Sequence, residues 1–233
     1  NLSGGQESNV VRFAMPKEGI TKVNDLIRGE VEWRNETLND FIILKSDGFP
    51  TYHLANVVDD HIMHISHVLR AEEWLSSTPR HLQLYDALGY EPPLFGHLPM
   101  ILGPDRAKLS KRHGSTSVLE YRTMGFLPEA MVNFMALLGW SLDDKTDVIS
   151  RDDLVKSFSL ERIGKGAAVF DLDRLQWMNG VYIRSLEDDD LAQRMLPYLG
   201  GDGVVDRGYL RRIVPLIRER FKTMADVPEW TSY

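Results

Sequence analysis

The sequence contains no cysteine, no long apolar run and none of the common motifs for covalent or metal-assisted hydrolysis. Without cysteine, disulfides, thiolate nucleophiles and cysteine-ligated zinc are excluded. The most apolar stretch, residues 130–140, is too short to span a bilayer and contains Asn133. No P-loop, Gly-x-Ser-x-Gly or His-Glu-x-x-His pattern occurs. These absences remove several large classes of enzyme and any transmembrane helix.

The composition is that of an acidic globular protein. The chain has 233 residues, and 34 acidic against 27 basic residues give a net charge of −7. With 43% apolar and 26% charged residues, it predicts one or two domains and excludes collagen, low complexity and bulk disorder. The acidity argues against a uniformly basic nucleic-acid binder, although a local basic patch can still bind RNA. The first residue is Asn1 rather than Met, which indicates processing or a piece of a longer protein.

Short β-prone runs dominate the first 50 residues. Apolar or alternating stretches predict strands in a small sheet or set of hairpins, and the Ser-Asp-Gly-Phe-Pro run at 46–50 predicts a turn. The predicted strands are residues 10–15, 23–29, 30–33 and 41–44.

The next 50 residues predict a parallel sheet. A buried strand over 65–69 is followed by a helix with Thr78 as N-cap and Gly89 as its end, and then by a strand over 94–102. Strand, helix and strand in this order form a βαβ unit. Ligands of such sheets bind at the carboxyl ends of the strands, where Arg70 and the loop after the second strand would lie.

From residue 115 onward the pattern is helical. We expect one helix over 128–138 and another over 171–178 that ends near Gly180. The Ser-Leu-Glu-Asp run at 185–188 resembles a capping box that opens a further helix. A last helix over 207–222 has a basic face.

The first candidate for chemistry is a basic loop at 105–114. Four Lys or Arg against one Asp give it a local charge of +3 within an acidic chain. Lys108 and Lys111 flank the hydroxyl of Ser110, so the loop could clamp a polyphosphate and stabilise a leaving pyrophosphate. The residues alone leave open the alternative of a solvated surface loop.

The second candidate is Arg70, directly after an apolar run. A guanidinium at a strand end can bind a carboxylate with two parallel hydrogen bonds. The alternative is a structural salt bridge with Glu72 or Glu73. Tyr52 and Asn56 lie upstream, either as polar groups of the site or as hydrogen-bonding groups of the core.

Three histidines at a spacing of three suggest a metal site, but only weakly. His61, His64 and His67 would alternate between the two faces of a strand, so one ion could not meet all three. We therefore expect no metal bound by the protein.

Taken together, the segments resemble one family. Residues 108–112, Lys-Leu-Ser-Lys-Arg, resemble the Lys-Met-Ser-Lys-Ser signature of class I aminoacyl-tRNA synthetases, and their extension to Gly114 resembles its glutamyl form. Other segments are similar to stretches of bacterial glutamyl-tRNA synthetases in the same order: residues 46–61, 70–79, 126–130 and 173–180. The resemblance covers nearly the whole chain.

The resemblance implies ATP-dependent activation of L-glutamate to glutamyl-adenylate and its transfer to tRNA(Glu), with ATP and Mg²⁺ as cofactors. Lys111 would contact the ATP phosphates, and Lys108 and Ser110 would belong to the same mobile catalytic loop. Glu73 and Trp74 would lie near the nucleotide, with Lys108 also binding ATP.

Glutamate and tRNA would be bound elsewhere. The resemblance implies that Arg70, with Tyr52 and Asn56, binds a carboxylate of glutamate. For tRNA we expect phosphate contacts from the basic helix through Arg211, Arg212 and Arg218. The alternative is a solvated helix face paired with Glu219 and Asp206.

The implied fold class is α/β: the second half of a Rossmann-like parallel sheet, preceded by part of an α+β insertion and followed by all-helical regions. Residues 1–50 would end the acceptor-binding insertion, and 51–103 would form the second half of the nucleotide-binding catalytic domain. The signature loop and stem-contact region would span 104–187, and the anticodon-binding region would start at 188–233. We expect a cytoplasmic monomer without a membrane partner.

Two departures from the family pattern stand out. The His-Ile-Gly-His signature, which the family places before these strands, is absent, so we expect an internal fragment that is inactive by itself. His64 stands where the family usually has a small residue, commonly Gly. The competing functions are a non-catalytic tRNA-binding fragment, a glutaminyl-tRNA synthetase, and the glutamyl-Q type enzyme that glutamylates a modified base of tRNA.

Overall fold

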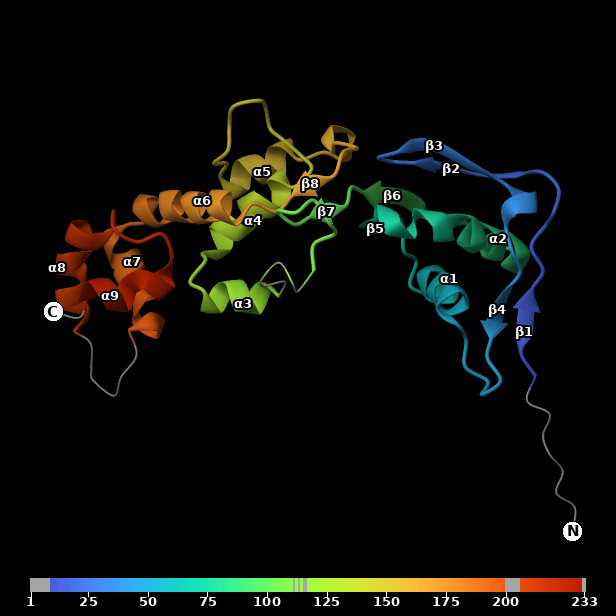
Figure 1. The fold of residues 1–233 in the computed structure, drawn as a ribbon, viewed down its shortest axis with the longest axis horizontal. Coiled ribbons are helices and arrows are strands. Elements are labelled where there is room, and N and C mark those ends of the chain that lie inside the picture. Colours follow the sequence, from blue (N-terminus) through green and yellow to red (C-terminus); the bar gives the residue numbers. More distant parts are fainter. Residues whose placement is uncertain (1–8, 111, 113, 115–116, 200–205, 232–233) are drawn as a thin grey trace, which may run out of the picture. The chain divides into compact units, whose positions relative to one another are not determined.

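A computed structural model describes residues 9–110, 112, 114, 117–199 and 206–231 (Figure 1). The chain divides into two compact units, residues 1–100 and residues 101–233. Each unit buries apolar clusters of its own.

Four short strands open the first unit and confirm the predicted hairpin region. Strand β1 (Val11–Phe13) pairs antiparallel with β4 (Phe41–Leu44). Strand β2 (Ile20–Asp25) pairs antiparallel with β3 (Gly29–Arg34). The strand predicted over 23–29 was wrong in its bounds, because it spans the end of β2 and the turn.

The β2–β3 turn has a defined backbone. Asp25 pairs with Gly29 across a three-residue loop, and Gly29 has a φ of 81°, which glycine adopts without steric cost. Along β2 the buried side chains alternate with exposed ones, so Thr21, Val23 and Asp25 all face inward. A carboxylate is thereby placed at the inner end of the hairpin.

The predicted βαβ unit is confirmed. Strand β5 (His67–Ala71) and β6 (Leu94–Leu98) run parallel, with His67 opposite Leu94. Between them lie a 3₁₀ segment, η2 (Glu72–Ser77), and helix α2 (Thr78–Leu88). Helix α1 (Tyr52–Ile62), which precedes β5, was not anticipated from the sequence.

Several predicted bounds in this unit were wrong. The strand expected over 65–69 begins two residues later and is half exposed. The N-cap of α2 is Ser77, because the chain enters the helix directly from η2, and Thr78 is its first residue. Gly89, with a φ of 68°, ends α2 as expected. The strand expected over 94–102 breaks after Leu98.

We had assumed that the three histidines share a strand, and this was wrong. His61 lies in the last turn of α1, His64 in the turn that follows, and His67 at the start of β5. Within the described part of the chain, no group of three His, Cys, Asp or Glu residues is placed to hold a metal ion.

The second unit is mainly helical, as predicted for the chain after residue 115. Its two short strands, β7 (Ile101–Leu102) and β8 (Ala168–Val169), run parallel. The α-helices within its described residues are α3 (Val118–Thr123), α4 (Pro128–Leu137), α5 (Arg151–Ser157), α6 (Leu172–Ser185), α7 (Asp188–Met195), α8 (Arg207–Ile217) and α9 (Val227–Thr231). None of the helices that the structure describes is long and apolar enough to cross a membrane.

Helix bounds in this unit correct three predictions. Helix α6 does not end near Gly180 but passes through it, and a side chain at this buried position would meet those of Arg184 and Lys222. Helix α7 has Glu187 as N-cap and no capping box. Helix α8 ends at Ile217, five residues before the predicted end at 222, and α9 follows it.

Candidate carboxylate-binding site

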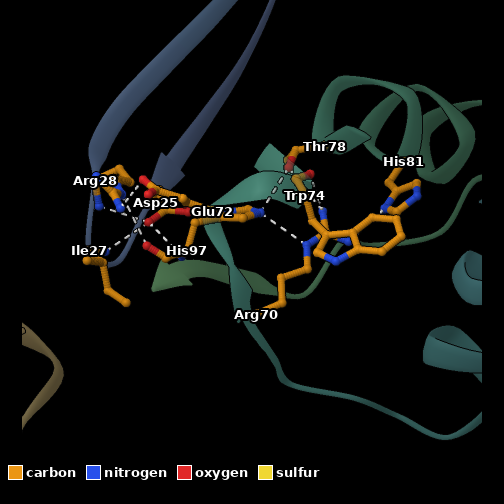
Figure 2. Close-up of polar contacts among 9 residues, drawn as sticks. All are labelled: Asp25, Ile27, Arg28, Arg70, Glu72, Trp74, Thr78, His81 and His97. Atoms are coloured by element: carbon orange, nitrogen blue, oxygen red, sulfur yellow. Dashed lines mark hydrogen bonds and ion pairs between the residues drawn. The ribbon is translucent and has the colours of Figure 1, made fainter. Parts of the chain in front are cut away.

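Arg70, in β5, makes polar contacts with four neighbouring residues (Figure 2). Its Nε donates to Nε2 of His97 at 3.1 Å. Its Nη2 donates to Oγ1 of Thr78 at 3.1 Å and to the carbonyl of Trp74 at 3.3 Å. Its Nη1 lies 3.4 Å from Nδ1 of His81. The guanidinium is therefore held by β6, η2 and α2 at the same time.

These four contacts are all with uncharged groups. Burial lowers the pKa of Arg70 from its ordinary value, against the opposing effects of Tyr52 and Asp60. The alternative salt bridge with Glu72 is not formed, because Glu72 pairs with Arg28 and accepts from the Met100 N–H at 3.0 Å. A partly desolvated cation held by neutral groups favours an anionic ligand.

Two exposed aromatic residues, Tyr52 and Trp74, lie near Arg70. Tyr52, the first residue of α1, is 50% exposed, and its ring centroid lies 5.1 Å from that of Trp74. Tyr52 also raises the pKa of the Arg70 guanidinium, against the effect of burial. Asn56 lies four residues along α1 and so shares a helix face with Tyr52. The structure thus brings Arg70, Tyr52 and Trp74 together, with Asn56 one turn away.

Behind Arg70 lies a buried Asp25–His97 pair that sequence reasoning missed. Asp25 Oδ2 is 2.5 Å from His97 Nδ1, and both side chains are fully enclosed. Asp25 Oδ1 accepts from the backbone N–H groups of Ile27, Arg28 and His97 at 2.9–3.1 Å. Burial raises the pKa of Asp25, but these hydrogen bonds together bring it below its ordinary value. The carboxylate is therefore ionised, and burial lowers the pKa of His97, which stays neutral.

A second histidine pair lies on the other side of Arg70. His81 Nε2 is 2.9 Å from His53 Nδ1. Burial, with the nearby Arg70 charge, lowers the pKa of His81 to about 3. Because arginine can only donate, Nδ1 of His81 is the acceptor, and its Nε2–H donates to His53. Arg70 thus fixes the tautomer of the neutral His81.

The basic loop belongs to the second unit and is tied to β7. Leu102 bridges Lys108, and the N–H of Leu109 donates to the carbonyl of Ile101 at 2.9 Å. The turn is closed at Gly103, whose N–H donates to the carbonyl of Ala107 at 2.8 Å. Lys108 is exposed and Ser110 is half-buried. Lys111, the residue assigned to the ATP phosphates, lies outside the described residues.

The basic helix is partly neutralised by the preceding helix. Arg211 Nε lies 3.1 Å from Asp189 of α7. Arg218 pairs with Asp188 and also donates to the carbonyl of Arg184 at 3.2 Å. Arg212 is exposed.

The acids predicted to pair with this helix have other contacts. Asp206 caps α8 by accepting from the Gly208 N–H at 2.8 Å. Glu219 lies 3.6 Å from Arg184. Internal pairing is thus present, but with different partners from those predicted.

Comparison with known proteins identifies the class of this fold and site. Residues 2–177 match the family described as tRNA synthetases class I (E and Q), catalytic domain. The chain is 57% identical over 238 residues to the glutamate–tRNA ligase of Dehalococcoides mccartyi, covering 99% of this chain and 49% of that protein. It is 49% identical to the enzyme of Moorella thermoacetica, covering 96% of this chain and 47% of that protein.

A solved structure gives the same result. The glutamate–tRNA ligase from Elizabethkingia meningosepticum, in complex with its amino acid, matches with a TM-score of 0.85 and 36% identity. The match covers 96% of this chain and 48% of that one. The chain belongs to the class I family of glutamyl- and glutaminyl-tRNA synthetases, and these similar proteins are glutamate–tRNA ligases. The predicted family and fold class are confirmed. The chain spans about half the length of the curated relatives it matches.

Proposed function

We propose that this chain is the part of a glutamate–tRNA ligase that binds L-glutamate through Arg70 and ATP through the loop at 108–111. The ligase would join L-glutamate to tRNA(Glu) through glutamyl-adenylate. The observation that carries the proposal is the Arg70 guanidinium, held by neutral groups that include the carbonyl of Trp74, whose exposed ring packs against that of Tyr52. A relative of the same fold has been solved in complex with its amino acid, and this supports the proposal.

The geometry of Arg70 suits a carboxylate. Its contacts with His81 and with the Trp74 carbonyl are the longest, at 3.4 and 3.3 Å, so they are the ones most easily exchanged for carboxylate oxygens. The new hydrogen bonds would join two charged groups and so would be stronger than those they replace. The Tyr52 hydroxyl would add one more donor, and Asn56 would lie beside it.

The basic loop would supply charge to the activation step. When the glutamate carboxylate attacks the α-phosphorus of ATP, negative charge develops on the departing pyrophosphate. Lys111, with Lys108 and Ser110, would stabilise that charge, and Glu73 and Trp74 would lie near the nucleotide. Mg²⁺ would be bound chiefly by the ATP phosphates, as is usual for nucleotide enzymes.

The remaining regions would contact tRNA. Residues 1–50 would end the acceptor-binding insertion and 51–103 would complete the nucleotide-binding sheet. Residues 104–187 would contact the acceptor stem, and 188–233 would begin the anticodon-binding region. Arg211, Arg212 and Arg218 would face tRNA phosphates, with Arg212 the most available. We place this activity in the cytoplasm, in a monomer without a membrane partner.

The proposal is tested by ATP–pyrophosphate exchange in the complete ligase that contains this chain, with tRNA(Glu) present. Arg70→Ala should raise the KM for glutamate by about 10- to 100-fold, because charged hydrogen bonds are lost, and leave the KM for ATP unchanged. Arg34→Ala, at an exposed position of β3, is the matched control. An unchanged glutamate KM in Arg70→Ala would remove Arg70 from the site.

The role of the loop is tested separately. Lys111→Ala should slow single-turnover adenylate formation far more than it weakens glutamate binding, because its charge acts on the leaving pyrophosphate. Equal losses in both measurements would contradict the assigned role.

A further inference from the structure

We propose that Asp25 and His97 are positioning residues for Arg70, and that Asp25 acts by fixing the tautomer of His97. The inference rests on the proposed role of Arg70 in binding glutamate. Neither residue would touch the substrate; they would set the plane in which the guanidinium meets it. Figure 2 shows the chain of contacts from the hairpin turn, which carries Asp25 and Arg28, through His97 to Arg70.

The hairpin turn fixes the Asp25 carboxylate first. Oδ1 accepts from three backbone N–H groups, those of Ile27, Arg28 and His97. Only Oδ2 remains for the imidazole, at 2.5 Å from Nδ1 of His97. An ionised carboxylate can only accept, so Nδ1 of His97 must carry the proton.

That tautomer leaves the other ring nitrogen as an acceptor. Nε2 of His97 is 3.1 Å from Nε of Arg70 and 3.3 Å from Oγ1 of Thr78. Arginine has five donors and no acceptor, so only an unprotonated Nε2 is compatible with this contact. Thr78 closes the triangle, because its hydroxyl accepts from Arg70 Nη2 and can donate to His97.

The hairpin turn is held rigidly against β6. The N–H of Leu26 donates to the carbonyl of Phe95 at 2.8 Å, and Nε of Arg28 donates to the carbonyl of His97 at 3.2 Å. With His97 and Asp25 0% and 2% exposed, no bulk water competes for these bonds. His97 therefore occupies Nε of the guanidinium, so a carboxylate would bind at the Nη groups in exchange for their contacts with His81 and the Trp74 carbonyl.

Asp25→Asn is the most direct test, because the backbone N–H groups of the turn determine how the amide is oriented and so which nitrogen of His97 carries the proton. The asparagine oxygen should replace Oδ1, where three N–H groups converge, so its NH₂ would face Nδ1 of His97. His97 would then carry its proton on Nε2, and two N–H groups would face each other at Arg70. The same inversion of tautomer by an acid-to-amide change is known from serine proteases.

We expect Asp25→Asn in the complete ligase to raise the KM for glutamate by about 10-fold or more, with the KM for ATP unchanged. The control is Thr21→Val, also buried on β2, whose hydroxyl bonds Asn35 and Gln83 and not Arg70. The control should leave both KM values unchanged. If Asp25→Asn leaves the glutamate KM unchanged, or if both variants raise it equally, the positioning role is wrong.

A spectroscopic measurement keeps the test decisive if the variant folds poorly. Two-bond ¹H–¹⁵N spectra of the His97 ring should show the Nδ1–H tautomer in the wild type and the Nε2–H tautomer in Asp25→Asn. An Nε2–H tautomer in the wild type would overturn the inference directly.

Two substitutions of His97 separate its two contacts. Gln places an amide oxygen near the position of Nε2 and can accept from Arg70, whereas Asn reaches only the Nδ1 position. His97→Gln should keep a glutamate KM closer to that of the wild type than His97→Asn; the reverse order would contradict the proposal. If Arg70→Ala does not change the glutamate KM while the wild-type tautomer is Nδ1–H, the proposed function fails and the positioning of Arg70 stands.

Discussion

The interiors of the two units differ in kind. Within the described residues, the first unit buries seven polar or charged side chains: Thr21, Asp25, Asn35, Ser77, Thr78, His81 and His97. The second buries three: Asn133, Asn179 and Thr223. Each of the two apolar clusters of the second unit, built around residues such as Phe134 and Leu191, also has more buried members than the cluster of the first unit.

The buried side chains have a different role in each unit. In the first unit the buried polar groups orient a cation, and most of them contact Arg70 or one of its partners. Such networks define geometry strongly but add little net stability, because each group gives up its hydration. In the second unit apolar packing dominates, and this contributes stability in proportion to the area buried. We therefore expect a loss of apolar packing to destabilise chiefly the second unit, and protonation of buried groups to destabilise chiefly the first.

The largest expected effect is a cavity in the second unit. Phe134 is 2% exposed and packs edge-on against Phe170, with ring centroids 5.0 Å apart. Phe134→Ala should lower the free energy of unfolding of this unit by about 3–5 kcal/mol. Hydrogen exchange of peptides from each unit measures this; peptides from residues 9–100 should be unaffected. Val155→Ala, at a position 75% exposed, is the control. Equal loss of protection in both units would show that their stabilities are not separable.

Lowering the pH should destabilise the first unit more than the second, the opposite of the effect of Phe134→Ala. The pKa of His81 is about 3 in the folded chain and 6.5 in the unfolded chain, so on acidification the unfolded chain takes up the proton first. The stability this gives is complete above pH 6.5 and is lost as the pH falls toward 3. Between pH 7 and 5 the first unit should lose about 2 kcal/mol.

The same hydrogen-exchange measurement, repeated against pH, checks this effect. Six of the seven histidines lie in the first unit, so the second unit should change little. His81→Gln should flatten the pH dependence of the first unit. A dependence that is as steep in this variant as in the wild type would show that His81 is not its source.

The smallest expected effect is a gain in the first unit. His64 has a φ of 54°, in the left-handed region, and follows the end of α1. The N–H of Ile65 donates to the Asp60 carbonyl, and that of His64 to the His61 carbonyl, a pattern that usually has glycine in the left-handed position. His64→Gly should raise the free energy of unfolding of the first unit by about 1 kcal/mol. His64→Ala keeps the strain and should bring no such gain; an equal gain in both variants would contradict the explanation.

The parts of this fold that follow from local patterns were predictable. Alternating residues predicted strands in the region of the β2–β3 hairpin, although with wrong bounds for β2, and the order of apolar runs predicted the parallel β5–β6 pair. Helix α1, along which only Val57 is buried, was missed. The end predicted at Gly180 was wrong because that glycine lies inside α6, where a side chain would meet those of Arg184 and Lys222, rather than in a turn.

The residues of the candidate site also divide into those that were predictable from the sequence and those that were not. Arg70 was singled out because it follows an apolar run, with Tyr52 upstream of it, and Trp74 because its segment resembles a family; the structure brings the three together. Asp25 and His97 lie in no recognised motif and are 72 residues apart. Their relation is purely tertiary, and a single sequence gives no signal for it. An inward-facing acid on β2 and a histidine within an apolar strand were the only local hints.

The hairpin turn also constrains how this protein could be recombined with a relative. Because Asp25 belongs to β2 and His97 to β6, a chimera with its crossover point anywhere between residues 26 and 96 takes the acid from one parent and the imidazole from the other. If the parents differ at either position, we expect the hybrid to lose the hydrogen bonds that orient Arg70, even where Arg70 itself is kept. The strands at the start of the chain are thus not an exchangeable module, and recombination is safest where the crossover keeps the two residues together.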